Sequence, residues 1–585
     1  MSHVNAFYKM ILVLHLIVTS YLVATSQSTY FVTPSGAGTM DGSSWLNASD
    51  DLQAMIDGAS AGDQIWVAQG TYLPTVKMDF DNSGTADARE TIFYINKNIR
   101  IYGGFLGGES QLIQRDWIAN PTILSGDIGA GNNTSDNSYH VIYIDASSAP
   151  ITNNCILDGL HIRHGNANGS SDLHNWGGGL YLDGKTNSCK PTLHQLSIAQ
   201  NSATYGGALY CDADNGVCSP LIALCKIDSN QASKDGGGIY FQTNNGMSTS
   251  FVNNTQFRGN SATNYGGAVF HYTDQAAGSC TPEYSNCLFM LNSAAEGGGI
   301  ASENNNGLCL PTFRNATFYN NSATMNSGAI DNRRIGGTCG SRFYNSILWA
   351  NQNQIENTGG ATVDLDHSIY DDGNPDNLLN YPTGVTSNGP VTDLDPRFRD
   401  QTNLDLRVLP GSPAINGGDN NDIGTNITQD LDGKPRIIYN LVDIGPYENN
   451  CPMNNDPILV DIDALGDGIG TSWAHAFNDI QDGIDLACNC DTGAVLPVWV
   501  AEGTYYPTLK VNLDEERRRT FYITKNVGLF GGFNGTETTF SQRDFRTNEV
   551  ILSGDIGVKN DPADNTYHVV SIVDNQNLIT DDCMI

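Results

Sequence analysis

Four aspartates in one acidic stretch have the residue type and close spacing of a calcium-binding loop. Asp419, Asp422, Asp430 and Asp432 lie near one another in the sequence, with Asn421 among them. Hard cations such as calcium prefer several oxygen ligands from closely spaced side chains. The stretch lacks the full twelve-residue EF-hand pattern, so a solvated loop in a terminal cap is the alternative. No other metal site and no other cofactor is predicted.

Paired acids and adjacent bases are the next groups that suggest chemistry. Asp50-Asp51 begins a predicted helix, and Asp371-Asp372 precedes Gly373 in a predicted turn. Carboxylates favour both positions for structural reasons, as a helix cap and as a turn residue. Arg333-Arg334 is the one adjacent basic pair in the repeats and offers a candidate lyase base. We read the acids as structural and assign no catalytic residue to these pairs.

One histidine and one aspartate occur twice in the chain. His140 and Asp127 return as His568 and Asp555 in a later, similar segment. A histidine is a common general base, but retention in two copies shows only that both copies need it. Packing or hydrogen bonding in an early coil is the favoured interpretation.

Aromatic residues stand beside several glycine pairs. Trp176, Tyr205 and Tyr265 each precede a Gly-Gly turn. Such rings can stack on sugars, because they combine an apolar face with a polar edge. Covering the corners of the fold is the alternative interpretation, and the favoured one.

The element that positions these residues is a repeat of about thirty residues, marked by Gly-Gly, a small residue and an aliphatic one. The copies begin at Gly177, Gly206, Gly236, Gly266, Gly297 and, in a weakened form, Ser327. A period of this length indicates a solenoid, propeller or array, in which each unit buries its apolar face against its neighbours. Helical periodicity is absent, and glycine-rich and asparagine-rich units disfavour paired helices. A parallel β-helix with one coil per repeat remains.

A second motif precedes each glycine pair, with an apolar residue followed three positions later by Asn. The pairs are Ile198 with Asn201, Ile227 with Asn230, Phe257 with Asn260, Phe289 with Asn292, and Phe318 with Asn321. Stacked coils would place the apolar residues in one core column and let the asparagines hydrogen-bond along the stack.

These paired motifs resemble those of the chlamydial polymorphic outer membrane proteins and, more broadly, the pectate-lyase-like right-handed β-helix superfamily. The resemblance covers about Cys155 to Trp349, and Leu406 to Glu448 resembles the closing region of bacterial β-helix surface proteins. It implies an all-β, right-handed parallel β-helix with a short N-terminal capping helix. The same scaffold carries adhesins, passenger domains and polysaccharide-degrading enzymes, so the resemblance is weak for function.

The chain also contains a long internal duplication, with most pairs 428 positions apart, as in Trp45 and Trp473. Each copy opens with a predicted capping helix, around Leu52 to Ala59 and around Ile480 to Ala487. The predicted parts are a signal peptide at 1–26, a cap with first coils at 27–154, repeat coils at 155–349, closing coils and cap at 350–448, a linker at 449–457, and the start of a second β-helix at 458–585. We expect this second copy to be truncated.

Export is predicted from the first residues and from the charge. Met10 to Val23 is an apolar stretch behind Lys9, too short to cross a bilayer and suited to a signal-peptide core. With 63 acidic and 29 basic residues, the net charge of −34 disfavours nucleic acid as a partner. We expect an extracellular or cell-surface location, and membrane association only through an anchor that this chain does not show.

Thirteen cysteines are many for a cytosolic protein. Five occupy one position of the repeat, namely Cys189, Cys218, Cys280, Cys309 and Cys339. Stacked coils would allow Cys189 to pair with Cys218, and Cys309 with Cys280 or Cys339. The alternative is a column of reduced, buried thiols, and the spacing does not suit zinc.

The function expected from these features is a non-catalytic, adhesin-like or structural β-helix that binds carbohydrate or a surface protein. Two alternatives stay open. One is a polysaccharide lyase or glycoside hydrolase that uses one face of the helix. The other is a structural component of a surface layer or matrix.

Overall fold

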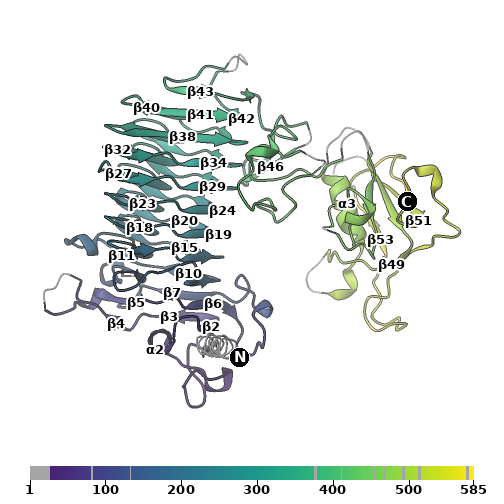
Figure 1. Cartoon of the computed structure of the whole chain (residues 1–585). Helices are drawn as coiled ribbons and strands as arrows, with labels where there is room; N and C mark the ends of the chain where they lie inside the picture. The colour runs from purple at the N-terminus through teal and green to yellow at the C-terminus, as the bar shows by residue number, and fades with distance from the viewer. Residues whose placement is uncertain are drawn as a thin grey trace, which may run out of the picture.

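Most of the chain winds into stacked coils in the computed structural model, coloured from purple to green in Figure 1. The structure describes residues 27–80, 84–131, 133–374, 379–409, 411–438, 441–452, 456–466, 468–490, 495–511, 515–574 and 579–585. The predicted signal peptide, 1–26, and residues 453–455 of the predicted linker lie outside the described residues.

Each coil contributes strands to columns that run the length of the stack. The ten-stranded sheet contains β4 (Val76–Lys77), β5 (Thr91–Ile95), β8 (Ile142–Asp145), β12 (Leu180–Asp183), β17 (Leu209–Asp212), β22 (Ile239–Gln242), β27 (Val269–Thr273), β32 (Ile300–Asn304), β37 (Ile330–Arg334) and β40 (Ile355–Thr358). The eleven-stranded sheet contains β3 (Gly70–Tyr72), β7 (Thr122–Ser125), β10 (Leu160–Arg163), β15 (Ser197–Ala199), β20 (Lys226–Asp228), β25 (Gln256–Arg258), β30 (Leu288–Met290), β35 (Thr317–Tyr319), β39 (Ile347–Trp349), β42 (Ser368–Tyr370) and β44 (Val391–Thr392).

Two further sheets complete the coils. The seventeen-stranded sheet contains β1 (Thr29–Val32), β2 (Gln64–Ala68), β6 (Arg100–Phe105), β9 (Ile156–Asp158), β13 (Ser188–Cys189), β14 (Thr192–His194), β18 (Val217–Cys218), β19 (Leu221–Ala223), β23 (Met247–Ser248), β24 (Phe251–Asn253), β28 (Ser279–Cys280), β29 (Glu283–Ser285), β33 (Leu308–Cys309), β34 (Thr312–Arg314), β38 (Thr338–Tyr344), β41 (Thr362–Asp366) and β43 (Val385–Ser387). The six-stranded sheet contains β11 (Asn166–Ala167), β16 (Ser202–Tyr205), β21 (Gln231–Asp235), β26 (Ser261–Ala262), β31 (Ser293–Ala294) and β36 (Ser322–Ala323).

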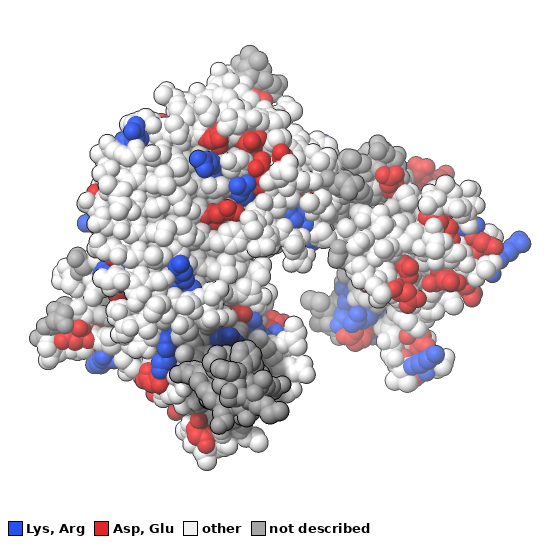
Figure 2. Space-filling view, in the orientation of Figure 1, with Lys and Arg blue, Asp and Glu red and all other residues white. Residues whose placement is uncertain are grey.

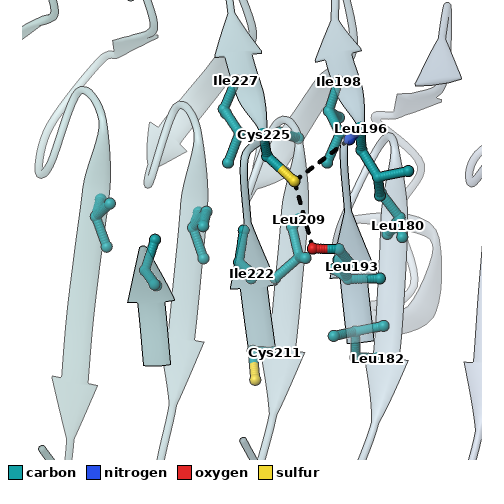
Figure 3. Packing of buried hydrophobic residues seen from close by; sticks show 14 of the residues in the cluster. Leu180, Leu182, Leu193, Leu196, Ile198, Leu209, Cys211, Ile222, Cys225 and Ile227 are labelled. Carbon is teal, nitrogen blue, oxygen red and sulfur yellow. Dashed lines mark hydrogen bonds between the residues drawn. The ribbon is translucent and has the colours of Figure 1, made fainter. Parts of the chain in front are cut away.

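Neighbouring coils pair in parallel and in register, so like residues lie above like. Ile198 pairs with Ile227, which pairs with Phe257, and the column continues through Phe289 and Phe318. All five side chains are fully buried. Figure 3 shows how the leucines and isoleucines of successive coils fill the interior between the sheets. The predicted parallel β-helix is confirmed.

The predicted asparagine column is also confirmed. The side-chain amide of Asn201 donates to Oδ1 of Asn230 at 3.1 Å, and Asn230 donates to Asn260 at 3.0 Å. The same bond links Asn260 to Asn292 and Asn292 to Asn321, at 3.0 and 2.9 Å. Each amide also donates to a backbone carbonyl of the preceding coil, so the corner polar groups are satisfied inside the protein.

The first glycine of each repeat motif turns the chain. Gly177 has φ 64°, and its counterparts in the next coils have φ between 63° and 68°. A Cβ atom on Gly177 would lie 2.2 Å from the carbonyl oxygen of Leu180. Only glycine fits both the positive φ and this close approach.

Helix α2 (Leu52–Gly58) covers the first coil, as predicted. Asp51 is its N-cap, and the Asp51 side chain accepts a 3.0 Å hydrogen bond from the backbone N–H of Ala54. Leu52 and Ile56 are buried against the core. This arrangement protects apolar residues of an end coil from water.

The cysteines require a correction. Cys189 and Cys218, and likewise Cys280, Cys309 and Cys339, stack in register as expected. The bridges that stacking would allow between these coils do not form, and all of these residues except Cys218 carry free, buried thiols, as the alternative of a reduced column requires. The two disulfides join Cys211 to Cys218 and Cys451 to Cys490. The Cys211–Cys218 bridge joins two consecutive strands of one coil, β17 and β18. The repeat spacing alone does not predict this contact.

The closing segment folds back along the outside of the coils, beside β46 (Asp405–Val408) in Figure 1. Four corner asparagines with positive φ hold it, namely Asn254, Asn286, Asn315 and Asn345. Their side-chain amides donate to the backbone carbonyls of Asp430, Gln429, Asp443 and Asp419, respectively. A buried ion pair between Arg436 and Glu448, 2.8 Å apart, lies within the segment.

The later part of the chain repeats the opening of the first β-helix. Strands β47 (Ile458–Val460), β48 (Pro497–Ala501) and β51 (Gly528–Phe533) pair in parallel, and α3 (Ile480–Asn489) packs against them. The indole N–H of Trp473 donates to the carbonyl of Glu537 at 2.8 Å, as Trp45 donates to Glu109 at 2.9 Å. This part has its own hydrophobic core.

Charged side chains are dispersed over the surface. On the face shown in Figure 2, most of the β-helix is uncharged, and acidic and basic residues stand singly or in small mixed groups. Within the described ranges, none of the helices has the length and apolar character needed to span a bilayer.

Candidate functional site

An open groove lies on the outer face of the ten-stranded sheet, and its floor is a ladder of aromatic rings. Tyr210, Tyr240 and Phe270 occupy equivalent positions in β17, β22 and β27. The Tyr210 and Tyr240 ring centroids are 4.9 Å apart, with planes 14° from parallel. All three rings are buried. The groove has a volume of about 350 Å³, which is within the range of small-molecule sites.

The walls of the groove come from two other positions of the repeat. The residues that precede the glycine corners contribute Trp176, Tyr205, Asp235 and Tyr265. The opposite wall consists of Gln242, Tyr272 and Glu303, which lie two positions beyond Tyr240, Phe270 and Ala301 in β22, β27 and β32. The structure thus brings together the three aromatic residues singled out in the sequence. They cover the corners and, because their rings are half-buried, also offer partly exposed faces to the groove.

Two lysine side chains contact aromatic residues in the wall of the groove, Lys185 at Trp176 and Lys234 at Tyr205. The ammonium of Lys185 is 4.6 Å from the Trp176 ring centre and 3.1 Å from Oδ2 of Asp212. The ammonium of Lys234 contacts the Tyr205 hydroxyl at 3.0 Å. These contacts hold both aromatic side chains by charge and by packing.

Arg333 contacts residues from both walls of the groove. Its Nη1 atom donates to the Tyr265 hydroxyl at 2.7 Å and lies 3.3 Å from Oε2 of Glu303. Its Nη2 atom lies 3.3 Å from Oε2 of Glu296. The guanidinium therefore links one wall to the other and has its charge balanced by two carboxylates.

Two carboxylates face the groove in different electrostatic settings. The pKa of Asp235 is raised to about 6, chiefly by burial and with a contribution from the negative charge of Glu303, against the opposing effect of hydrogen bonds from Asn264 and Tyr265. Oδ1 of Asp235 accepts the backbone N–H of Tyr265 at 3.3 Å. Glu303 is half-buried and paired with Arg333. The site therefore combines flat apolar faces with oriented oxygen acceptors, which suits a ligand with both apolar faces and N–H or O–H groups.

A ladder of hydrogen bonds from tyrosine hydroxyl groups to the next coil leads into the floor at Tyr210, and sequence reasoning missed it. The hydroxyl groups of Tyr94, Tyr143, Tyr181 and Tyr210 donate to Asp145, Asp183, Asp212 and Gln242 of the next coil, at 2.6, 2.7, 2.8 and 3.1 Å. The signal was a Tyr-x-Asp tripeptide that recurs once per coil, at Tyr143, Tyr181 and Tyr210. Read together with the glycine step, it would have placed an aromatic ladder on one outer face.

His140 has a structural role, in line with the favoured interpretation. It is fully buried, with Nδ1 2.9 Å from the carbonyl of Gly177 and Nε2 2.7 Å from that of Leu173. Burial lowers the pKa of His140 to about 4, and the two carbonyls partly oppose this shift. Asp127 is half-buried in the loop after β7, and the counterparts His568 and Asp555 are exposed and half-buried, respectively.

Three of the four predicted calcium ligands, Asp419, Asp430 and Asp432, each make a separate set of contacts. Asp419 caps η6 (Asn420–Asp422), and buried Asp430 accepts the backbone N–H groups of Asp432, Lys434 and Glu448. Asp432 lies 3.6 Å from Arg407. Calcium binding by these residues stays a prediction.

Asp422 alone among the candidates lies in a group that offers converging ligand atoms. It is joined there by Asp366 and His367, and one ligand atom of each lies within 4.8 Å of the others. Nδ1 of His367 is 2.6 Å from Asp366, and the Arg314 guanidinium is 3.4 Å from Asp422. Asp422 is therefore already paired with a guanidinium, and Asp366 is already in contact with His367.

The paired acids have a structural role, and the two adjacent arginines make different contacts. Asp371 and Asp372 accept the backbone N–H groups of Gly373 and Asn374, so they shape the turn expected from the sequence. Arg333 lies at the groove, whereas the exposed Arg334 donates to the carbonyl of Gly337.

No family model and no curated protein matches the chain. Among solved structures, the chain is similar to pectate lyase Pel9A, with a TM-score of 0.33 and 14% identity over 72% of this chain and 97% of that one. It is also similar to XylC, solved in complex with xylose, with a TM-score of 0.31 and 11% identity over 72% of this chain and 98% of that one. Because both TM-scores are low, the β-helix assignment rests on the strand pairing of this chain. The likeness to polymorphic outer membrane proteins stays a prediction.

Proposed function

We propose that this chain is a secreted or cell-surface β-helix protein that binds a polysaccharide in the aromatic groove without cleaving it. The observation that carries the proposal is the set of half-buried rings of Trp176, Tyr205, Tyr265 and Tyr272 around one groove. Trp176, Tyr205 and Tyr265 hold one wall position in three coils, Asp235 holds it in the coil between Tyr205 and Tyr265, and Tyr272 lies on the opposite wall. A chain-like ligand lying along the stack therefore meets this wall position once per coil. Aromatic faces bind the apolar faces of sugar rings while their edges stay hydrated.

The state of the charged residues supports binding over turnover. Arg333 is held by Tyr265, Glu296 and Glu303. A lyase base must be free to take a proton from the substrate, and a guanidinium paired with two carboxylates is poorly suited to this. Asp235 accepts a backbone N–H, which fixes its position as an acceptor.

The location and wider role complete the proposal. An acidic chain with a predicted signal peptide suits an extracellular setting, and a stack of coils with a continuous core is a stiff spacer. An adhesin-like role in envelope or matrix attachment follows from these two properties and from ligand binding.

A polysaccharide lyase or hydrolase is the second candidate. Asp235 and Glu303 line the same groove, and Arg333 contacts Glu303. A carboxyl group with a pKa of about 6 can donate a proton near neutral pH. Paired carboxylates and a base are the groups that such enzymes use.

A retention assay with product analysis separates the two candidates. The protein is run through gels that contain neutral, cationic or anionic polysaccharides, and each mixture is assayed for reducing ends and unsaturated products. We expect retardation by at least one polysaccharide, loss of at least tenfold in affinity in Tyr205→Ala, and no loss in Tyr506→Ala, an exposed tyrosine of the second copy. Sustained product release that Asp235→Asn abolishes would establish the enzyme, and lack of retention by every polysaccharide would refute binding.

A further inference from the structure

The groove has the composition of a site for an organic cation. Its lining consists of six aromatic residues, two carboxylates and one amide, besides the ring of Trp176. Aromatic faces attract ammonium groups through the ring quadrupole, and a carboxylate beside them supplies the opposite charge. Of the basic residues near the groove, Lys185 is paired with Asp212 and Arg333 with Glu296 and Glu303, while the ammonium of Lys234 contacts the Tyr205 hydroxyl at 3.0 Å.

The position of the carboxylates within the groove is specific. Asp235 lies in the wall between Tyr205 and Tyr265, since β16 pairs Tyr205 with Asp235 and the Tyr265 N–H donates to Asp235. Glu303 lies on the opposite wall, next to Tyr272 in register. Between them the floor is formed by the rings of Tyr240 and Phe270.

We infer that the groove selects a saccharide bearing a free ammonium group, with the ammonium at Asp235 and Glu303 and the sugar rings on the aromatic faces. The inference rests on the proposed function and narrows its ligand class. An anionic saccharide, such as a polyuronate, is disfavoured because its carboxylates would lie against Asp235 and Glu303. A neutral saccharide keeps the stacking contacts and loses the charge–charge contact.

Three tetrasaccharides of equal length and one small organic cation separate the effect of charge from that of stacking. Isothermal titration calorimetry at pH 7 and low salt compares a glucosamine tetramer, its N-acetylated form, a tetragalacturonate and choline with the full-length protein. We expect the glucosamine tetramer to bind at least about tenfold more tightly than the N-acetylated form, because one charge-assisted contact distinguishes them. Tetragalacturonate and choline should bind more weakly than the N-acetylated tetramer.

Substitutions at Asp235 and Glu303 test whether these carboxylates bind the ammonium group. Asp235→Asn keeps the shape of the side chain and should bring the two glucosamine-based tetramers within about threefold of each other, mainly by weakening the charged one. Glu303→Gln is a second variant in case Asp235→Asn does not fold, and it should reduce the same ratio. Asp364→Asn on β41, in a different sheet, carries the same change in net charge and should leave the ratio unchanged.

The outcomes distinguish this inference from the proposed function. Equal or tighter binding of the neutral or anionic tetramer overturns the inference and leaves polysaccharide binding standing. Choline affinity equal to that of the glucosamine tetramer overturns the saccharide part of the inference. Binding of none of the saccharides overturns both. Two further results would overturn the assignment of the charge contact to Asp235 and Glu303. One is that neither groove variant reduces the preference for the glucosamine tetramer, and the other is that Asp364→Asn removes this preference.

Discussion

The hydroxyl of Tyr181 donates a 2.8 Å hydrogen bond to the carboxylate of Asp212 in the next coil. Asp212 is almost fully buried, and burial raises its pKa, while Lys185 and the Tyr181 hydroxyl oppose that shift. The same bond joins Tyr143 to Asp183 one coil earlier. The outer row of tyrosines that leads into the groove floor is therefore held by bonds between coils as well as by ring packing.

Replacing Tyr181 with Phe tests this ladder. The ring packing remains, but Asp212 loses a donor in a buried setting, so we expect a loss of about 2 kcal/mol in the free energy of unfolding. Urea unfolding followed by circular dichroism measures it. Tyr506→Phe, at an exposed tyrosine, is the control and should change stability by less than about 0.5 kcal/mol. Equal stability of both variants would show that the bond contributes nothing.

The asparagine column predicts a larger effect. Asn260→Ala removes the donor to the Ile227 carbonyl and to Asn292, and the acceptor for Asn230. Several buried groups are left without partners, so we expect a loss of about 3 kcal/mol or more. Asn306→Ala, at an exposed turn, should be nearly neutral. Similar midpoints for the two variants in a denaturant titration would argue against a stabilising column.

The sequence predicts the stacked coils well but only some of the residues that line the groove. The recurring Phe257, Asn260 and Gly266 positions identify the core, the corner and the turn, because stacking makes each position repeat its role. The groove depends on which outer residues face one another across a sheet, and this follows from register rather than from any local motif. Trp176 and Tyr205 were therefore recognised as candidates, whereas Asp235 and Glu303 were not. The Cys211–Cys218 bridge was missed for a similar reason, since it joins different positions of one coil.

Asp331 predicts a dependence of stability on pH. It is buried, and burial raises its pKa to about 6, reinforced by the charge of Glu296. The native state keeps the proton up to about pH 6, whereas the unfolded chain releases it near pH 4. The stabilising contribution is therefore full below about pH 4 and is lost as pH rises through 6.

Asp331→Asn removes this titration. We expect the variant to gain stability relative to the original protein as pH rises from 4 to 7, by at most about 3 kcal/mol. Unfolding free energies of both proteins at several pH values measure the difference. A difference that is constant over this range, or that falls with rising pH, would contradict the assignment.

The disulfide arrangement predicts how many free thiols the protein contains. Two disulfides and thirteen cysteines leave nine free thiols. Alkylation of the unfolded, unreduced protein followed by mass spectrometry should add nine labels. In the folded protein, Cys155, Cys225 and Cys287 should react slowly, because burial raises the pKa of each to about 12. Seven or fewer labels, with a bridge among Cys280, Cys309 and Cys339, would contradict the arrangement described above.

The most direct test of polysaccharide binding is a crystal structure of the protein with the oligosaccharide that it retains best. The account predicts sugar rings against Tyr205, Tyr265 and Tyr272, lying along the groove from coil to coil. An ordered oligosaccharide bound elsewhere, with the groove free of it, would contradict the account.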